Sequence, residues 1–290
     1  MVVQDRRGGA VAAAVACGTG LVAGLLATTG CSSEGVAADD QAQPVRAAVR
    51  ATGAVELQRG IEALLRAGTA KVRTAMETVS GGTRVAIRGT GGYDFAAGSG
   101  QLRVVLPDLK GKPSGGHQPI TEILAPGALF MKNRGAGVPA DKWVRVDTAA
   151  LTDGNLVTGG ATDPLAAAEL LRGAREVTYQ GQERLGGVAV RHYRGTADLA
   201  AAAGAASART RPALVAAEKG FTTALVPFDA YLDDAGRLRK VRQRFRFANG
   251  APKGAAVTST TVLYGFGSRV AVRLPERRDI YTGKIASAPS

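Results

Sequence analysis

Two histidines are the first candidates for acid–base chemistry in this sequence. His117 lies in a glycine-rich loop and His192 lies between Arg191 and Tyr193, and neither has the nearby partner that a catalytic base requires. No Gly-x-Ser-x-Gly nucleophile motif occurs, and the glycine pairs lack the Lys-Ser/Thr of a phosphate-binding loop. Two cysteines do not supply a Cys/His metal site. We therefore expect a protein that is not an enzyme and has no cofactor and no metal.

Cys31 is the residue whose surroundings indicate a covalent modification. Arg6 and Arg7 precede an uncharged run of small and apolar residues from Ala10 to Ala27, and small residues lead on to Cys31. A basic start, an apolar run and a small-residue exit are typical of a secretory signal. The sequence around Cys31 resembles a bacterial lipoprotein signal, although Thr28 stands where leucine is usual. The resemblance implies that Cys31 is lipidated and becomes the mature N-terminus.

Two other interpretations of this N-terminal segment stay open. The apolar run is nearly long enough for a transmembrane helix, although its glycines and alanines make it weakly hydrophobic. Cys31 is alternatively an ordinary cysteine near a cleavage site. If it is lipidated, the protein is extracytoplasmic and anchored to the outer face of the cell membrane.

The chain is basic, with 37 Lys+Arg against 24 Asp+Glu and a formal net charge of +13. A basic protein tethered at a membrane is attracted to anionic headgroups. Nucleic acid is another common partner of basic proteins, but it conflicts with export, and the sequence has no recognition motif for it. We expect the cytoplasmic membrane as a partner, through the N-terminal lipid anchor, and no nucleic acid.

Hydrophobic periodicity separates helices from strands along the chain. Residues 45–67 carry apolar side chains at helical spacing. Asp163 and Pro164 begin a second helix that Gly173 ends, and the alanine-rich residues 199–219 predict one or two helical pieces. Alternating patterns with turn glycines between them predict strands over residues 71–79, 83–88, 101–106, 120–124, 128–132, 143–147, 176–182, 188–196, 226–232, 238–247, 256–264 and 270–274.

These patterns predict an α+β fold. The sequence has no alternating βαβ units, so a parallel sheet is not expected, and a large antiparallel sheet must curl as it twists. We expect one large curled antiparallel sheet of roughly ten strands, with helices covering its concave face. The expected organisation is a signal peptide over residues 1–30, a flexible tether over 31–44, one domain over 45–285 and a tail over 286–290.

One predicted strand, Leu238 to Phe247, has a cationic face and an apolar face. Apolar Val241, Phe245 and Phe247 share one face. The other face carries Lys240, Arg242, Arg244 and Arg246. One interpretation is a solvated outer face of the sheet. The other is a contact for the anionic headgroup of a lipid or for an anionic membrane.

The layout of the chain is similar to that of a known family. A lipobox-like cysteine leads through a polar tether and an amphipathic helix to a long antiparallel meander, as in the actinobacterial LppX/LprA/LprF/LprG lipoproteins, relatives of the LolA-type carriers. The local phrases that resemble this family are Leu129-Phe130-Met131-Lys132, Asp141-Lys142-Trp143-Val144-Arg145-Val146, the hairpin from Val226 to Leu238, and Val272-Arg273-Leu274-Pro275. The resemblance covers about residues 45–285 and implies a half-open β-barrel that holds acyl chains.

The resulting hypothesis is a membrane-anchored lipoprotein that binds or carries a lipid or lipoglycan between the sheet and the helices. An export-machinery protein is a possible partner. The residues expected to line the lipid-binding cavity are Val85, Ile87, Leu102, Val104, Leu129, Val188, Val190 and Phe228; for each of them ordinary core packing is the alternative. The alternative function is a non-enzymatic envelope interaction or sensing module of the same fold with a filled interior.

Overall fold

The computed structural model describes residues 42–80, 83–106, 118–135, 137–157, 161–247 and 255–283. Residues Gln41–Ser290 form one compact unit. The predicted signal peptide, Cys31, most of the predicted tether, His117 and the predicted tail lie outside the described residues. No helix in the described ranges is long and apolar enough to cross a membrane.

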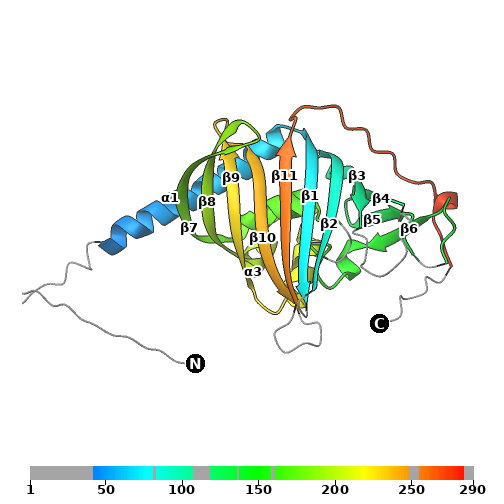
Figure 1. The fold of residues 1–290 in the computed structure, drawn as a ribbon. Helices are drawn as coiled ribbons and strands as arrows, with labels where there is room; N and C mark the ends of the chain where they lie inside the picture. The colour runs from blue at the N-terminus through cyan, green and yellow to red at the C-terminus, as the bar shows by residue number, and fades with distance from the viewer. Residues whose placement is uncertain are drawn as a thin grey trace, which may run out of the picture. The chain divides into compact units, whose positions relative to one another are not determined.

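An antiparallel sheet of eleven strands dominates the described part of the chain (Figure 1). Its order is β6-β5-β4-β3-β2-β1-β11-β10-β9-β8-β7. This confirms the expected α+β class, with one large antiparallel sheet that curls and does not close. The strands are β1 (Thr69–Ser80), β2 (Thr83–Asp94), β3 (Ser99–Val105), β4 (Ile120–Ala125), β5 (Ala128–Lys132), β6 (Trp143–Asp147), β7 (Ala174–Leu185), β8 (Val188–Asp198), β9 (Leu225–Asp233), β10 (Leu238–Phe247) and β11 (Ala255–Tyr264).

The sheet consists of two meanders, β1–β6 and β7–β11. They meet where β1 and β11, the first and last strands in chain order, pair with each other. Lys71 of β1 lies opposite Tyr264 of β11, and the register continues without a shift to Val79 opposite Ala256. Since side chains alternate across a strand, this register places Val72, Thr74 and Met76 on one common face with their partners on β11. That face is buried by the helices and is the concave side of the sheet.

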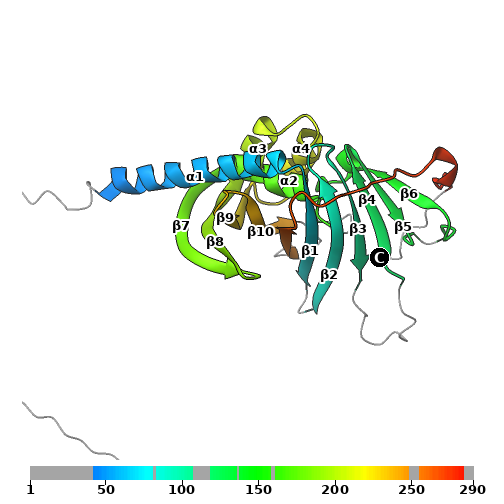
Figure 2. The ribbon, with the colours of Figure 1, turned by 90° about the horizontal axis from the view of Figure 1, so that it is seen from above.

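Helices cover the concave face, as expected (Figure 2). The long helix α1 (Ala42–Arg66) lies against β7, β9 and β10 and buries Leu57, Ile61 and Leu64. The connection from β6 to β7 supplies η1 (Thr148–Ala150), α2 (Pro164–Glu169) and η2 (Leu170–Gly173). Asp163 caps α2 by accepting hydrogen bonds from the amides of Leu165 and Ala166. The alanine-rich insertion forms α3 (Leu199–Ala205) and α4 (Arg211–Gly220).

The segment after β11 differs from the expectation. Residues 270–274 form no strand, because β11 is already paired on both sides, with β1 and β10. The chain instead runs along the upper ends of the strands from β11 to β6 (Figure 1), and includes the short turn η3 (Arg277–Asp279). Val272 and Ile280 pack on a second apolar cluster that includes Ile123 and Phe130, and Tyr281 donates its amide hydrogen to the Trp143 carbonyl. We call residues 265–283 the strap.

Candidate functional site

The concave face brings together six of the eight residues expected to line a cavity. Four of them, Leu102, Val104, Leu129 and Phe228, are at most 1% exposed and belong to the main core. Val85 and Ile87 lie on the same face of β2 and are half-buried, with Ile87 opposite Met76 of β1. All of them except Val85 belong to or pack against the main core cluster, which also contains residues of α1 and α2.

The other two residues lie on the convex face. Val188 and Val190 share their face of β8 with His192, whereas Tyr193 lies on the opposite, concave face and belongs to the main core. Val190 is 1% exposed, but it lies on the outer side of the sheet, opposite Asp233 in register. The sequence does not indicate which face of β8 is concave, because both faces of this strand carry apolar residues.

A buried carboxylate interrupts the apolar concave face. Glu122 of β4 is fully buried and lies between Leu102 of β3 and Met131 of β5 in register. Its Oε2 accepts a hydrogen bond from the Ala161 amide at 3.0 Å, and within the described residues Oε1 has no hydrogen-bond partner. Burial raises the pKa of Glu122 to about 7, although the Ala161 amide and Arg134 act in the opposite direction.

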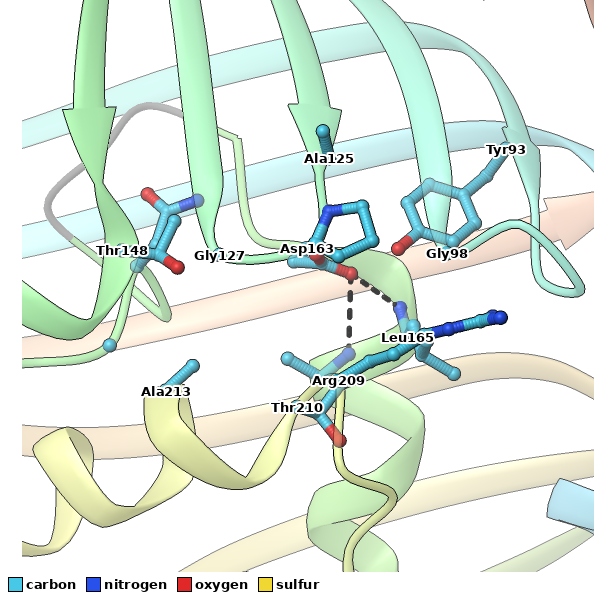
Figure 3. Close-up of a pocket in the computed structure, with 14 residues that line it drawn as sticks. Tyr93, Gly98, Ala125, Gly127, Thr148, Asp163, Leu165, Arg209, Thr210 and Ala213 are labelled. Carbon is cyan, nitrogen blue, oxygen red and sulfur yellow. Dashed lines mark hydrogen bonds between the residues drawn. The ribbon is translucent and has the colours of Figure 1, made fainter.

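A small polar cavity lies near the start of α2 (Figure 3). Its volume is about 20 Å³, and Tyr93, Asn155 and Asp163 are among its lining residues. Burial raises the pKa values of both Tyr93 and Asp163, and within the described residues the Asn155 side-chain amide has no hydrogen-bond partner. A cavity of this size has room for about one water molecule, so it is not a lipid site.

An apolar groove lies between η1 and α4, with a volume of about 460 Å³. One wall is formed by Ala149, Ala150 and Leu151, and the other wall by one side of α4. That side carries Pro212, Val215, Ala216 and Lys219, which recur at the spacing of a single helix face. Val215 is 36% exposed, and Lys219 is the single charged residue of the lining. The spacing of these residues in the sequence is the signal that could have predicted this exposed apolar helix face.

Close backbone packing fixes the walls of this groove. A Cβ atom added to Gly220 would lie 1.7 Å from the Thr152 carbonyl oxygen, and one added to Gly154, where φ is +59°, would lie 1.9 Å from the Ala213 carbonyl oxygen. Only glycine allows α4 to approach the segment after η1 this closely. The groove is therefore a preformed feature of the fold.

The cationic strand is β10, and its alternation is confirmed. Val241, Gln243 and Phe245 are buried on the concave side. On the convex side, Arg244 donates to Asp229 Oδ2 at 2.6 Å, and the Lys240 ammonium lies 4.5 Å from the centre of the Tyr231 ring. Arg242 and Arg246 make no ion pair with any described residue. Two of the four cations are thus committed to neighbours in the sheet and two are free to meet an anion.

His192 has two carboxylate partners that the sequence did not indicate. Its Nδ1 lies 2.7 Å from Glu183 Oε1 and its Nε2 lies 2.9 Å from Asp229 Oδ1, while the Tyr231 ring stacks on it at 4.3 Å. Arg194 also donates to Asp229, at 3.0 Å. Since both ring nitrogens are occupied by carboxylates, this histidine ties β7, β8 and β9 together and offers no free nitrogen to a substrate.

Comparisons with known proteins give structural similarities alone. No family model matches the sequence, and no curated protein matches it. Similar solved structures are the lipoprotein LppX of Mycobacterium tuberculosis (10% identity, TM-score 0.45, covering 77% of this chain and 98% of that chain) and LprF from Mycobacterium bovis (15%, 0.42, 77% and 97%). A putative outer membrane lipoprotein-sorting protein domain from Vibrio parahaemolyticus is also similar (8%, 0.29, 73% and 95%).

The first two structures belong to the group of lipoproteins that the sequence resembles. The fold class rests on the sheet and helices themselves.

Proposed function

We propose that this chain is a non-enzymatic, extracytoplasmic lipoprotein that binds an acyl chain of a lipid or lipoglycan. The observation that carries the proposal is the preformed apolar groove between η1 and α4. Burial of each methylene of an acyl chain contributes about 0.8 kcal/mol, so a short stretch of chain in this groove supplies several kcal/mol.

Positive charge near the groove and on the convex face supports an anionic headgroup. Lys219 lies at the groove and is exposed. Of the predicted headgroup contacts, Arg242 and Arg246 are free to act, whereas Arg244 and Lys240 are held by Asp229 and Tyr231. The proposal therefore keeps the cationic strand as a membrane contact and assigns that contact to its two unpaired arginines.

Lipidation of Cys31 is part of the same proposal. The lipid anchor would hold the domain at the outer face of the cell membrane, close to its lipid source, and an export-machinery protein would then be a partner that loads or unloads the lipid. The basis for this step is the signal-like sequence before Cys31.

An envelope interaction module is the second candidate. The observation in its favour is the dense packing of the concave face, where Leu102, Val104, Leu129 and Phe228 are in contact with other core residues and are nearly inaccessible. A filled interior leaves the surface groove as the place for an acyl chain and also suits a protein that binds only other proteins.

Filling the groove tests the lipid proposal. Ala216→Trp places a large side chain on the groove side of α4, and Glu218→Trp places the same side chain on the same helix outside the groove lining. We expect palmitate binding, measured by displacement of a fluorescent fatty acid, to fall with Ala216→Trp and to persist with Glu218→Trp. Equal binding by both variants would remove the groove from the proposal, and no binding by the unmodified protein would favour the interaction module.

A further inference from the structure

A second groove, of different chemistry, lies on the convex face beneath the strap. Its volume is about 460 Å³, and its lining comes from β1, β2, β3, β4 and the start of the strap. The strap is held in place here by Ser268, whose carbonyl accepts a hydrogen bond from the Thr69 hydroxyl at 2.7 Å, and by the Gly267 amide, which donates to the Thr69 carbonyl. The roof of the groove is therefore tied to the sheet.

Three cations from three separate segments line this groove. They are Lys71 of β1, Arg103 of β3 and Arg269 of the strap, and all three side chains are exposed. None of them forms an ion pair with a described residue, and the lining contains no aspartate or glutamate. Arg73 lies one row away on the same face, over the Tyr264 ring. Cations gathered without an acidic partner create a positive potential that attracts an anion.

The floor of the groove offers hydrogen-bond donors and little bulk. Thr90 and Thr121 lie on either side of Arg103 in register, and all three residues line the groove, so two hydroxyl groups lie on its floor beside the arginine. Gly92 lies opposite Gln101, and a Cβ atom at position 92 would lie 3.0 Å from Val270 Cγ2. The strap thus packs directly over a position without a side chain, which leaves the adjacent space open between the cations.

From this convergence we propose that the strap groove binds a phosphate group. Near neutral pH a phosphate group carries one negative charge as a phospholipid diester and about 1.5 to 2 as a monoester or free phosphate, and its tetrahedral oxygens accept hydrogen bonds from several directions. It therefore suits cations and hydroxyl groups that converge from separate strands better than a planar carboxylate does. The shared chemistry fits the headgroup of an anionic phospholipid and also a free phosphate or phosphate ester. This inference does not depend on the acyl-chain groove, because the two grooves share no residue.

The test removes the three positive charges of the strap groove and keeps polar side chains at the same positions. The full chain, purified in detergent, is titrated with inorganic phosphate by calorimetry at low salt, where screening is weak. Its variant carries Lys71→Gln, Arg103→Gln and Arg269→Gln. The matched control is Arg145→Gln, an exposed arginine of β6 outside the groove lining. Urea unfolding of each variant checks that the fold is retained.

We expect phosphate to bind the unmodified chain and the control equally, and the triple variant to bind about tenfold more weakly. Thr90→Val, which removes one hydroxyl and keeps the side-chain size, should weaken binding by a smaller factor. No phosphate binding by the unmodified chain, or equal weakening in the triple variant and in the Arg145→Gln control, would overturn the proposal.

A second arm identifies the source of the phosphate group. All forms carry Cys31→Ser in addition, so that no lipid anchor contributes, and are mixed with vesicles of phosphatidylglycerol or of phosphatidylcholine. Loss of phosphatidylglycerol binding in the triple variant assigns the site to a lipid headgroup. Retained vesicle binding together with lost inorganic phosphate binding assigns it to a free phosphate ligand. Failure of palmitate binding would leave both outcomes unaffected.

Discussion

Glu122 and Asp229 are buried carboxylates whose surroundings shift their pKa values in opposite directions. Burial favours the neutral form of both. At Asp229, hydrogen bonds from Arg194 and His192 and the charge of Arg244 outweigh burial and lower the pKa. Glu122 has the Ala161 amide as its hydrogen-bond partner, and burial raises its pKa to about 7. Asp229 therefore stabilises the fold in its charged form, whereas ionisation of Glu122 destabilises the core.

The stability of the protein should depend on pH through Glu122. Its pKa in the folded state lies above its ordinary value of 4.5, so folding binds a proton that the unfolded chain releases. The stabilising contribution is complete below about pH 4.5 and is lost as pH rises to about 7, an effect of roughly 3 kcal/mol in the free energy of unfolding. Glu122→Gln cannot ionise and keeps an acceptor for the Ala161 amide. We expect this variant to be more stable than the unmodified protein at pH 8 and similar to it at pH 5.

Urea unfolding at both pH values measures this difference. Asp229 contributes with the opposite sign: its lowered pKa means that its stabilisation is present above its ordinary value and is lost only in acid. The two effects therefore occupy separate pH ranges. If the two proteins had parallel stability profiles between pH 5 and pH 8, the Glu122 carboxylate would not titrate as described.

Single residues were predictable where a local pattern decides their environment. The alternation of β10 was readable because Lys240, Arg242, Arg244 and Arg246 are separated by residues that become buried. The partners of His192 were not readable, because Glu183 and Asp229 belong to the two neighbouring strands and meet it only through the register of the sheet. The face of Val188 and Val190 depends on the same register.

At the scale of elements, the contact between α4 and the segment after η1 depends on Gly220. Gly220→Ala would place a methyl group within 1.7 Å of the Thr152 carbonyl oxygen, so α4 must shift, at a cost of about 1–3 kcal/mol. Gly204 of α3 has open space around it, and Gly204→Ala should instead stabilise its helix by about 0.5–1 kcal/mol. Thermal unfolding of the two variants should therefore move in opposite directions.

Gly220→Ala should also weaken palmitate binding, because α4 forms one wall of the apolar groove. A variant with the stability and palmitate affinity of the unmodified protein would show that α4 is not packed as described. Gly204→Ala serves as the control for both measurements, since it makes the same substitution in a neighbouring helix away from the groove.

Elements were predicted well where their ends carry a chemical signal. Asp163 and Pro164 marked the start of α2, and the side chain of Asp163 does cap it. The strand expected over residues 270–274 shows the limit of such patterns. Whether a segment with alternating side chains becomes a strand depends on a free sheet edge beside it, and pairing of β11 with β1 removes that edge. This pairing joins residues 177 to 193 positions apart, which no local pattern records.

For the whole molecule, the lipid anchor can be separated from the fold. Cys31→Ser should move the protein from the membrane fraction to the soluble fraction and remove the mass of the attached lipid, whereas Cys17→Ser should change neither. Cys17 is a matched control because it is also preceded by small residues. Intact mass spectrometry of both variants measures the change in mass. If the unmodified protein carried no lipid and the Cys31→Ser variant stayed in the membrane fraction, a membrane-spanning segment would be indicated instead.

The overall architecture was predictable from hairpin spacing and the change of period after residue 67, whereas the degree to which the interior is filled was not. The filling of the interior depends on how α1 and the connection from β6 to β7 lie over the concave face. The side chains involved are apolar whether the interior is filled or holds a cavity. The choice between a lipid carrier and an interaction module therefore rests on the surface groove and on ligand content.

Native mass spectrometry of the protein purified from its own host, with lipid extraction alongside, tests the central claim most directly. We predict a bound lipid at a defined stoichiometry, released on unfolding and reduced by Ala216→Trp but not by Glu218→Trp. A mass that corresponds to protein alone, in a sample that also takes up no added lipid, would contradict lipid binding and favour the interaction module.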